Sequence, residues 1–456
     1  MFEKPAGALI DDEFSYRIKP YNAALPRVEN PMVFCECKTE IDVKEIIHWA
    51  KKHHGTLIPM GGNTNLIEAT RYDPQNSISQ SALVIMLSYA STRLSYCKTT
   101  HTLTCGAMAQ LGEINAYLDQ LGRRWDVNFS AQSATIGGIA STNAGGELAK
   151  AASQIKYVRM VCGNGKVHEL KPHESQTDSV FPNAGTATQG LIGMISSVTI
   201  QTKPKWKSTC SAMLELPLTK VTEFRHFVQN HSPLVACELI DAASMKNVTG
   251  KDHQGMTLLL KWASEGDLVL DDFWEVLMDA YPDYLDSMSV SDSIEKEDRM
   301  WTIRHDVSDA NRRWARQHNM EYVGYDLGIP KDQLTIVIQK IDQYVKAHQG
   351  QLFSFGHSMQ SSTHDTMHCN IALPGNISKT FIPQFIQSEL NNIDIQMAAE
   401  HGGCGHKSIQ DSLNLASNQE MQSLQALVNK YDPHQLFRRD IKQLLDVHEI
   451  KRASNE

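Results

Sequence analysis

Closely spaced cysteine pairs, an excess of basic residues and long apolar runs are all missing from this chain of 456 residues. Its nine cysteines include no C-x-x-C, and Cys35 and Cys37 form the only close pair. This spacing argues against a cysteine-rich zinc site, an iron–sulfur cluster and a disulfide framework, and it predicts reduced thiols. The formal net charge of −9 argues against a nucleic-acid partner, because phosphate contacts need a basic face.

No apolar stretch approaches the ~18 residues of a membrane-spanning helix, and the first residues, "MFEKPAGALIDDEF", contain no apolar run typical of a signal peptide. We therefore expect a cytoplasmic protein, and peripheral attachment at the inner face of a membrane stays open. The composition, 41% hydrophobic and 21% charged, is that of globular domains. Because a single core rarely exceeds ~250–300 residues, the chain should form more than one domain.

Two common phosphate-binding patterns are absent as well, the P-loop G-x-x-x-x-G-K-[ST] and the dinucleotide pattern G-x-G-x-x-G. Apolar positions at i, i+3, i+4 and i+7 instead predict a helix over residues 40–54, with Gly55 as its stop, followed by a strand-like "TLIPM". The next residues are Gly61, Gly62, Asn63, Thr64 and Asn65. Glycines there permit positive φ and the close approach of an anion, although a plain turn is the alternative.

A second stretch of small residues, "SATIGGIASTNAGG" (residues 133–146), predicts another loop without bulky side chains around Gly137 and Gly138. Strand-like runs follow it: a hairpin whose turn is Gly163-Asn164-Gly165, and a buried strand over residues 191–202. One large ligand between the two glycine loops explains them more economically than two independent turns. Prolines and lysines in "KPKWK" (residues 203–207) predict a linker.

The two glycine stretches carry a resemblance to a known family. "PMGGNTNL" resembles the flavin-diphosphate loop, and "SATIGGIASTNAGG" the second flavin-contacting loop, of FAD-binding oxidoreductases of the vanillyl-alcohol oxidase and p-cresol methylhydroxylase type. "TQGLIGMISSVTI" is similar to the strand that closes that domain, with Gln189 where an acid is usual. "EKEDRMWTIRHDVSDA", "GYDLGIP", "GH…HCN" and "EHGGCGHK" then match, in order, cap-domain motifs of the D-2-hydroxyacid dehydrogenase branch. That branch includes D-2-hydroxyglutarate and D-lactate dehydrogenases and the flavin subunit of glycolate oxidase.

The resemblance implies an α+β fold in which a two-subdomain FAD-binding domain of the p-cresol methylhydroxylase type is joined to an α/β cap domain with an antiparallel sheet. The expected divisions are an N-terminal segment (1–25), the FAD-binding domain (26–205), the cap or substrate domain (206–410) and a C-terminal helical segment (411–456) that returns to the FAD domain. A capping box at Ser417 and Glu420 and a stop at Pro433 also predict the last helix.

FAD is the cofactor that the resemblance implies, and it should be non-covalent because neither glycine stretch contains a histidine. The residues expected to contact FAD are Pro59, Met60, Gly61, Gly62, Asn63, Thr64, Asn65, Leu66, Gln132, Ser133, Ala134, Ile136, Gly137, Gly138, Ser141, Thr142, Gly190 and Ile195.

The metal ligands of the branch, two histidines and a glutamate, correspond to His357, His368 and Glu400. Such a set suits Zn²⁺ or Mn²⁺, although a chance grouping of histidines is the alternative. The branch usually places "GDGN" between histidines seven residues apart, whereas here the spacing is eleven. His364 stands at the usual spacing and competes with His368. We favour His368 because Asn370 follows it as in H-x-N, on a predicted strand whose alternate side chains share a face.

His401, which follows Glu400, is the general base that the resemblance implies, and an imidazole suits proton transfer at neutral pH. A hydrogen bond to the carboxylate is the structural alternative. Arg304 is the expected anchor of the substrate carboxylate, because a guanidinium can donate two parallel hydrogen bonds. Ser308, one helical turn later, shares its face. Asn370 completes the expected catalytic group.

Two further departures from the branch affect these expectations. Gly324 stands where a substrate-binding lysine is common, which predicts a substrate with different or fewer anionic groups. "DPHQLFRRD" replaces the usual D-P-x-x-x-L-N-P-G-K near the C-terminus, which alters the last flavin or domain contact.

The expected reaction is oxidation of a D-2-hydroxy acid, such as D-lactate or D-2-hydroxyglutarate, to the 2-oxo acid by hydride transfer to flavin N5, assisted by the metal. The acceptor that reoxidises FAD stays open among a quinone, an electron-transfer protein and oxygen, and so does a homodimer. The alternatives are a metal-independent FAD enzyme for another alcohol, a non-redox flavin transferase of the same fold, a flavin-binding module without catalysis and, from another class, a metal hydrolase.

Overall fold

The computed structural model describes residues 8–9, 32–64, 84–129, 131–146, 148–171, 186–285, 287–358, 362–375, 381–396 and 418–438. The chain divides into two compact units. The first unit contains Met1–Lys203 and Ser408–Glu456, and the second contains Pro204–Lys407. The boundary after Lys203 falls inside the segment that the sequence predicts to be a linker.

A small sheet with the order β1-β2-β4-β3 opens the first unit, and β2, β4 and β3 run parallel. Its strands are β1 (Ala8–Leu9), β2 (Met32–Cys37), β3 (Thr56–Pro59) and β4 (Val84–Tyr89). Helix α2 (Glu40–His53) connects β2 to β3 and buries the four apolar positions that predicted it. The helix ends at His53, just before Gly55, which the sequence predicted as its stop, and the left-handed residue of the cap is His54 (φ 53°).

The second sheet of this unit is antiparallel, with the order β5-β6-β10-β8-β9. Its strands are β5 (Leu94–Cys97), β6 (Thr102–Gly106), β8 (Ile155–Cys162), β9 (Val167–Leu170) and β10 (Gly193–Gln201). The predicted hairpin is confirmed, because β8 pairs with β9 and Gly165 takes φ 77° in the turn. The remaining short elements of this region are α3 (Leu111–Gln120), β7 (Arg123–Arg124), α4 (Ile136–Thr142), η2 (Ala151–Ser153) and β11 (Lys203–Pro204).

The C-terminal helix α13 (Asn418–Tyr431) belongs to the first unit, and Leu424 and Val428 lie in the core of the second sheet. After the helix, the chain pairs with β3: the amide of Leu57 donates to the carbonyl of Leu436 (2.9 Å), and the amide of Arg438 donates to the carbonyl of Leu57 (2.9 Å). The distant end of the sequence therefore supports the strand that leads into Gly61.

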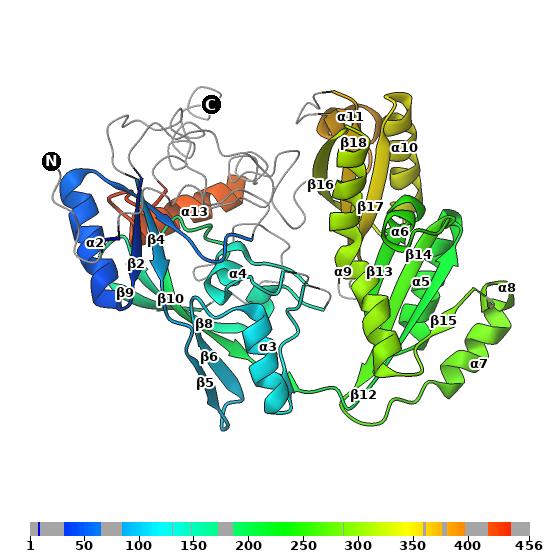
Figure 1. The fold of residues 1–456 in the computed structure, drawn as a ribbon, viewed down its shortest axis with the longest axis horizontal. Coiled ribbons are helices and arrows are strands. Elements are labelled where there is room, and N and C mark those ends of the chain that lie inside the picture. Colours follow the sequence, from blue (N-terminus) through cyan, green and yellow to red (C-terminus); the bar gives the residue numbers. More distant parts are fainter. Residues whose placement is uncertain are drawn as a thin grey trace. The chain divides into compact units, whose positions relative to one another are not determined.

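The second unit is built on a seven-stranded antiparallel sheet with the order β15-β12-β14-β13-β17-β18-β16 (Figure 1). Its strands are β12 (Ser208–Leu216), β13 (Leu234–Asp241), β14 (Met256–Ser264), β15 (Ser289–Val290), β16 (Glu321–Pro330), β17 (Gln351–His357) and β18 (His364–Leu373). Its helices are α5 (Leu218–His231), α6 (Ala242–Thr249), α7 (Asp271–Ala280), α8 (Pro282–Leu285), α9 (Ile294–Gln317), α10 (Leu334–Ala347) and α11 (Phe381–Glu389). The predicted antiparallel sheet is confirmed.

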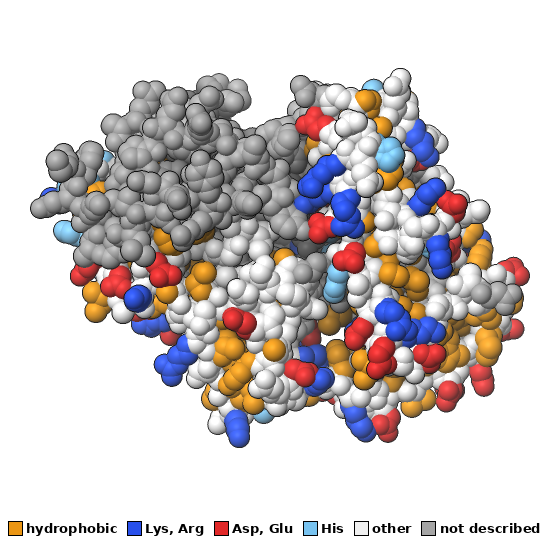
Figure 2. All heavy atoms as spheres, viewed as in Figure 1, with side chains coloured by type: hydrophobic (Ala, Val, Ile, Leu, Met, Phe, Trp, Pro, Cys, Tyr) orange, Lys and Arg blue, Asp and Glu red, His pale blue; other side chains and the backbone are white. Residues whose placement is uncertain are grey.

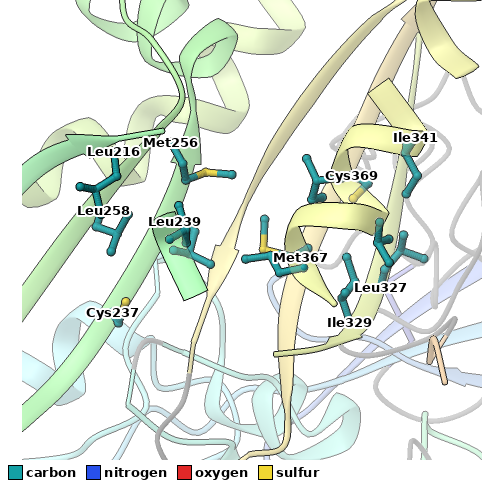
Figure 3. Close-up of a cluster of buried hydrophobic side chains, with 14 of the residues drawn as sticks. Leu216, Cys237, Leu239, Met256, Leu258, Leu327, Ile329, Ile341, Met367 and Cys369 are labelled. Carbon is teal, nitrogen blue, oxygen red and sulfur yellow. The ribbon is translucent and has the colours of Figure 1, made fainter. Parts of the chain in front are cut away.

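The two faces of this sheet differ in chemistry. Alternate strand residues, including Leu239, Leu327 and Met367, point to one face and belong to one hydrophobic core, to which α10 adds Ile341 (Figure 3). Helices α5, α7 and α11 add to the same core. Burying one such aliphatic side chain contributes about 1.5–3 kcal/mol, so this face accounts for much of the stability of the unit. The other face meets α6 and α9, and it bears charged side chains.

The outer surface carries charge of both signs. On the face in view, basic and acidic side chains are interspersed over the described surface of the second unit (Figure 2). Within the part of the chain that the structure describes, no helix combines the length and hydropathy that crossing a bilayer requires.

Candidate functional site

The first glycine stretch begins where β3 ends, and its glycines serve close packing. Neither Gly61 nor Gly62 has positive φ, and the left-handed residue is Asn63 (φ 53°), so the predicted conformational role of the glycines is wrong. A Cβ on Gly61 would lie 2.3 Å from Thr135 Oγ1, and one on Gly62 would lie 2.7 Å from the carbonyl oxygen of Ser133. Glycine is required because another backbone segment lies directly against it.

That other segment is the second small-residue stretch. The amide of Gly62 donates a hydrogen bond to Thr135 Oγ1 (3.2 Å), although the two residues are 73 positions apart in the sequence. The structure therefore brings together the two stretches that the sequence assigned to one ligand.

The second stretch is a helix and not the predicted loop. Residues Ile136–Thr142 form α4, and a Cβ on Gly137 would lie 3.1 Å from both the Cβ and the carbonyl oxygen of Ala107. Gly137 thus faces the interior, where it lets the helix approach the end of β6. Adjacent glycines indicated a loop, but here they remove bulk from the packed side of a short helix.

A third segment completes this region, which we call the cradle: residues 59–64, 133–142 and 186–190. The amide of Gln189 donates to the carbonyl of Ser141 (2.9 Å). Gly190 has φ 72°, and a Cβ there would lie 3.2 Å from Pro59 Cγ. Pro59, Ser141 and Gly190 are therefore neighbours, as the resemblance required of residues that share a ligand.

Other predicted FAD residues have visible structural roles. Thr142 Oγ1 donates to the carbonyl of Gly138 (2.9 Å), and Gln132 Nε2 donates to the carbonyl of Phe129 (2.7 Å). The side chains of Ala134, Ile136 and Ile195 are buried in the hydrophobic core. Asn65 and Leu66 lie outside the described residues. Met60 and Thr64 lie at the two sides of the glycines and are half-buried.

Unpaired polar atoms test whether the cradle fits a cofactor. Thr186 Oγ1, Thr188 Oγ1 and Gln189 Oε1 are buried, and none has a hydrogen-bond partner among the residues that the structure describes. A buried polar atom without a partner costs free energy, so such atoms call for a polar partner. The cradle therefore fits a cofactor that is rich in hydrogen-bonding groups.

The second predicted site lies on the charged face of the seven-stranded sheet. Glu238 on β13 stands directly opposite His357 on β17, and Asp326 on β16 stands opposite His368 on β18. His357 in turn pairs with Thr366, two residues before His368. Because cross-strand partners share a face, the two acids and the two histidines lie on one side of the sheet.

Glu238 contacts both a predicted metal ligand and the predicted substrate anchor. Its Oε1 lies 2.6 Å from His357 Nδ1, and its Oε2 accepts from Arg304 Nε of helix α9. Glu238 is fully buried, which opposes ionisation, but the nearby Arg304 and His357 hold the pKa of its carboxyl below the usual value. An ionised carboxylate can only accept, so His357 Nδ1 carries a hydrogen.

His368 has an equivalent arrangement. Its Nδ1 lies 2.7 Å from Oδ1 of the buried Asp326, and its ring lies 5.6 Å from the ring of His357, measured between centroids. The Arg304 guanidinium lies 5.0 Å from the ring centroid of Phe355, which lies on β17 opposite His368. We call Glu238, Arg304, Asp326, His357 and His368 the charged cluster.

The remaining predicted site residues are placed as follows. His364 Nδ1 lies 2.9 Å from Thr363 Oγ1, and its Nε2 lies 3.0 Å from the carbonyl oxygen of Asp394, so its ring has partners away from His357. Asn370 is buried on β18, and Ser308 is half-buried on α9. Glu400 and His401 lie outside the described residues. Among the described residues, no three His, Cys, Asp or Glu side chains form a metal-holding group.

Sequence analysis missed Glu238 and Asp326. Each is an acid flanked by apolar residues within a strand, in "LVACELID" and "GYDLGIP". An acid is rarely fully buried unless it is paired, so this pattern could have indicated a buried partner. It could not have identified the partner, because strand order was unknown.

Comparison with known proteins identifies the family. Residues 31–171 match the FAD-binding domain family, and residues 203–438, more than half of the chain, match the C-terminal domain of FAD-linked oxidases. The chain belongs to the FAD-linked oxidase family. Its cofactor is FAD, and the protein is an FAD-dependent oxidoreductase, as the sequence predicted. These matches argue against the alternative of a metal hydrolase.

Individual relatives are distant. A D-2-hydroxyglutarate dehydrogenase of Stutzerimonas stutzeri (strain A1501) is 21% identical over 389 residues, which cover 79% of this chain and 80% of the relative. A D-lactate dehydrogenase of Anaerostipes hadrus is 24% identical over 216 residues, which cover 46% and 44%. A solved structure of alkyldihydroxyacetonephosphate synthase is 13% identical with a TM-score of 0.65, covering 91% of this chain and 77% of that chain. This structural likeness confirms the predicted fold.

Proposed function

We propose that this FAD-linked oxidase oxidises a D-2-hydroxy acid to the corresponding 2-oxo acid. The observation that supports this most directly is the charged cluster, in which two imidazoles and a guanidinium meet on one sheet face. D-2-hydroxyglutarate and D-lactate dehydrogenases among the relatives point to the same substrate class. A carboxylate with a neighbouring hydroxyl needs a cationic anchor and a group that polarises or deprotonates the hydroxyl.

Arg304 holds the substrate carboxylate in this proposal. The ion pair of its Nε with Glu238 fixes the plane of the guanidinium, and the terminal nitrogens can then donate two parallel hydrogen bonds. Ser308, one turn later on α9, and Asn370, two residues after His368, add neutral donors. His401 accepts the hydroxyl proton.

His357 and His368, together with Glu400, would hold a divalent metal such as Zn²⁺ or Mn²⁺. Their contacts fit this role, because metal-binding imidazoles commonly donate their other N–H to a carboxylate. A bound cation would supply Lewis-acid polarisation of the substrate hydroxyl.

Non-covalent FAD, held by the cradle, supplies the two-electron acceptor for the hydride. The donor is oxidised by two electrons, and its hydroxyl proton passes to His401. A quinone, an electron-transfer protein or oxygen then reoxidises the cofactor, in a protein that we place in the cytoplasm, free or at the inner face of a membrane.

The substrate is expected to carry few anionic groups. Gly324 stands opposite Asn370 in the β16–β18 register, on the face that bears the charged cluster. A lysine at this position would add a second cation, and glycine supplies none. We therefore favour a monocarboxylate such as D-lactate over a dicarboxylate.

Anaerobic mixing of the yellow protein with D-lactate, D-2-hydroxyglutarate and glycolate tests the proposal. Bleaching of the visible flavin band by a D-acid, and not by its L-enantiomer, is the expected result. EDTA treatment should slow the bleaching, and added Zn²⁺ or Mn²⁺ should restore it. A flavin spectrum unchanged by every acid would overturn the proposal.

A non-redox flavin transferase is the second candidate, because the protein shares its fold with alkyldihydroxyacetonephosphate synthase. Persistent yellow colour with all hydroxy acids, together with a product from an acylated ether-lipid precursor, would favour this candidate.

A further inference from the structure

We infer that Glu238 and Asp326 are positioning residues: each fixes the ring orientation and the proton-bearing nitrogen of one histidine, and Glu238 also ties His357 to Arg304. This inference rests on the proposed function for the metal and the hydroxy acid. It assigns roles to two acids that the family resemblance did not supply.

The geometry of Glu238 supports the first step. Glu238 and His357 are directly opposed on neighbouring strands, and their side chains meet at 2.6 Å. A carboxylate engaged by a guanidinium is ionised and only accepts hydrogen bonds, so the imidazole must donate from Nδ1. The lone pair of the neutral ring then lies on Nε2, the nitrogen through which such an imidazole would bind a metal ion.

Asp326 gives the same result for His368. The pair is directly opposed on β16 and β18, the Nδ1–Oδ1 distance is 2.7 Å, and the Asp326 side chain is fully buried. The His357 and His368 rings are nearly perpendicular, at 88°, with centroids 5.6 Å apart. Ring centroids at this separation leave the two imidazoles close enough to bind one cation.

The two acids differ in one respect, which makes the inference testable. Glu238 accepts a hydrogen bond from Arg304 with its second oxygen, so it connects the proposed metal ligand His357 to the proposed substrate anchor Arg304. Asp326 holds the ring of His368, which lies on the neighbouring strand. Loss of Glu238 should therefore disturb both metal and substrate binding, whereas loss of Asp326 should disturb metal binding alone.

A matched control exists on the opposite face of the same sheet. Asp365 on β18 pairs with Arg225, and both side chains are fully buried. The pair lies on the face that packs against α5 and bonds to the carbonyl of Lys331. Asp365→Asn removes a buried acid of the same kind without contacting a histidine of the charged cluster.

The first experiment titrates Zn²⁺ into metal-stripped, flavin-loaded full-length protein and follows binding by calorimetry and elemental analysis. Glu238→Gln and Asp326→Asn should each weaken zinc binding by roughly 10–100-fold, the usual effect of losing such an acid behind a ligand. Asp365→Asn should bind zinc as tightly as the wild type. Unchanged affinity in both test variants, or no zinc bound by the wild type, would overturn the inference.

The second experiment measures flavin reduction at saturating zinc with the best hydroxy acid. Glu238→Gln should still show a raised KM, because Arg304 has lost its support, whereas Asp326→Asn should recover the wild-type KM. Equal KM values in the two variants would overturn the coupling role of Glu238.

A third measurement needs no folded variant of Glu238. Nitrogen-15 NMR of histidine-labelled wild-type protein without metal, assigned with His357→Asn and His368→Asn, should show both rings protonated at Nδ1. Protonation at Nε2 alone would overturn the inference. If zinc binding and the ring states agree with it while no hydroxy acid reduces the flavin, the proposed reaction fails and the positioning roles stand.

Discussion

The cradle in the first unit and the charged cluster in the second bring distant residues together by opposite means. In the cradle, side chains are removed: Gly61 and Gly62 leave room for the backbone and hydroxyl of a segment 73 positions away. In the charged cluster, long side chains are buried and each is held by a partner of opposite charge or a hydrogen-bond acceptor. The cradle should therefore fail when an atom is added, and the cluster should fail when a charge is removed.

The largest expected effect comes from removing either buried arginine. Arg304→Ala removes the cationic partner of the buried Glu238, and Arg225→Ala removes that of the buried Asp365. Leaving a buried charge without its partner costs about 3–5 kcal/mol, which urea unfolding of the second unit should show for both variants. Only Arg304→Ala should also raise the KM for the hydroxy acid. A similar rise in Arg225→Ala would show that the KM responds to general destabilisation of the second unit and not to loss of the substrate anchor.

The next effect concerns pH and compares two acids on β13. Burial raises the pKa of Asp241 to about 6, because its partners Ser244 and Ser354 are neutral donors, whereas Glu238 has a cation beside it. A raised pKa means that the native state binds more protons, so stability falls as pH rises between about 4 and 6.

Asp241→Asn should remove this pH dependence, which amounts to at most about 3 kcal/mol across the window. The measurement is the free energy of unfolding of both proteins in urea at several pH values. A difference between them that does not change with pH would contradict the expected shift. Glu238 acts in the opposite sense, since its lowered pKa makes it lose stability as pH falls.

A smaller effect is expected from adding one methyl group to the cradle. In Gly62→Ala, the new Cβ would collide with the backbone oxygen of Ser133, so the two segments must separate. We expect FAD retention, measured as the flavin-to-protein absorbance ratio after dialysis, to fall by at least about tenfold in apparent affinity, or ~1.4 kcal/mol. Gly266→Ala is the control, because its nearest atom lies 3.8 Å away. Full retention in Gly62→Ala would show that the cradle tolerates added atoms.

The smallest effect should come from His364→Ala. His364 contacts Thr363 and Asp394, whereas His368 contacts Asp326 and the ring of His357. Zinc affinity should stay unchanged in His364→Ala and should be lost in His368→Ala. The reverse result would make His364 the second ligand and would restore the spacing of seven residues that is usual in the branch.

Several elements could be predicted because their signals are local. The apolar spacing of α2, the hairpin turn at Gly163–Gly165 and the strand containing His368 each depend on residues that are close together in the sequence. Motif order was sufficient to predict the FAD-binding fold. The prediction around Gly137 was wrong for the same reason. Two adjacent glycines indicate a loop locally, but Gly137 lies in a helix, where the absence of a Cβ allows close packing against Ala107.

The sequence by itself determined the fold class, the cofactor and a few of the helices and strands, since periodicity, turn residues and family motifs are read along the chain. Only the tertiary structure decided that Glu238 meets His357, 119 positions away, and Arg304, 66 positions away. Those contacts depend on the strand order β13-β17-β18-β16 and on register, because a shift of one residue would turn Glu238 to the apolar face. The same holds for the Gly62–Thr135 contact, which needs two separate segments to pack without intervening side chains.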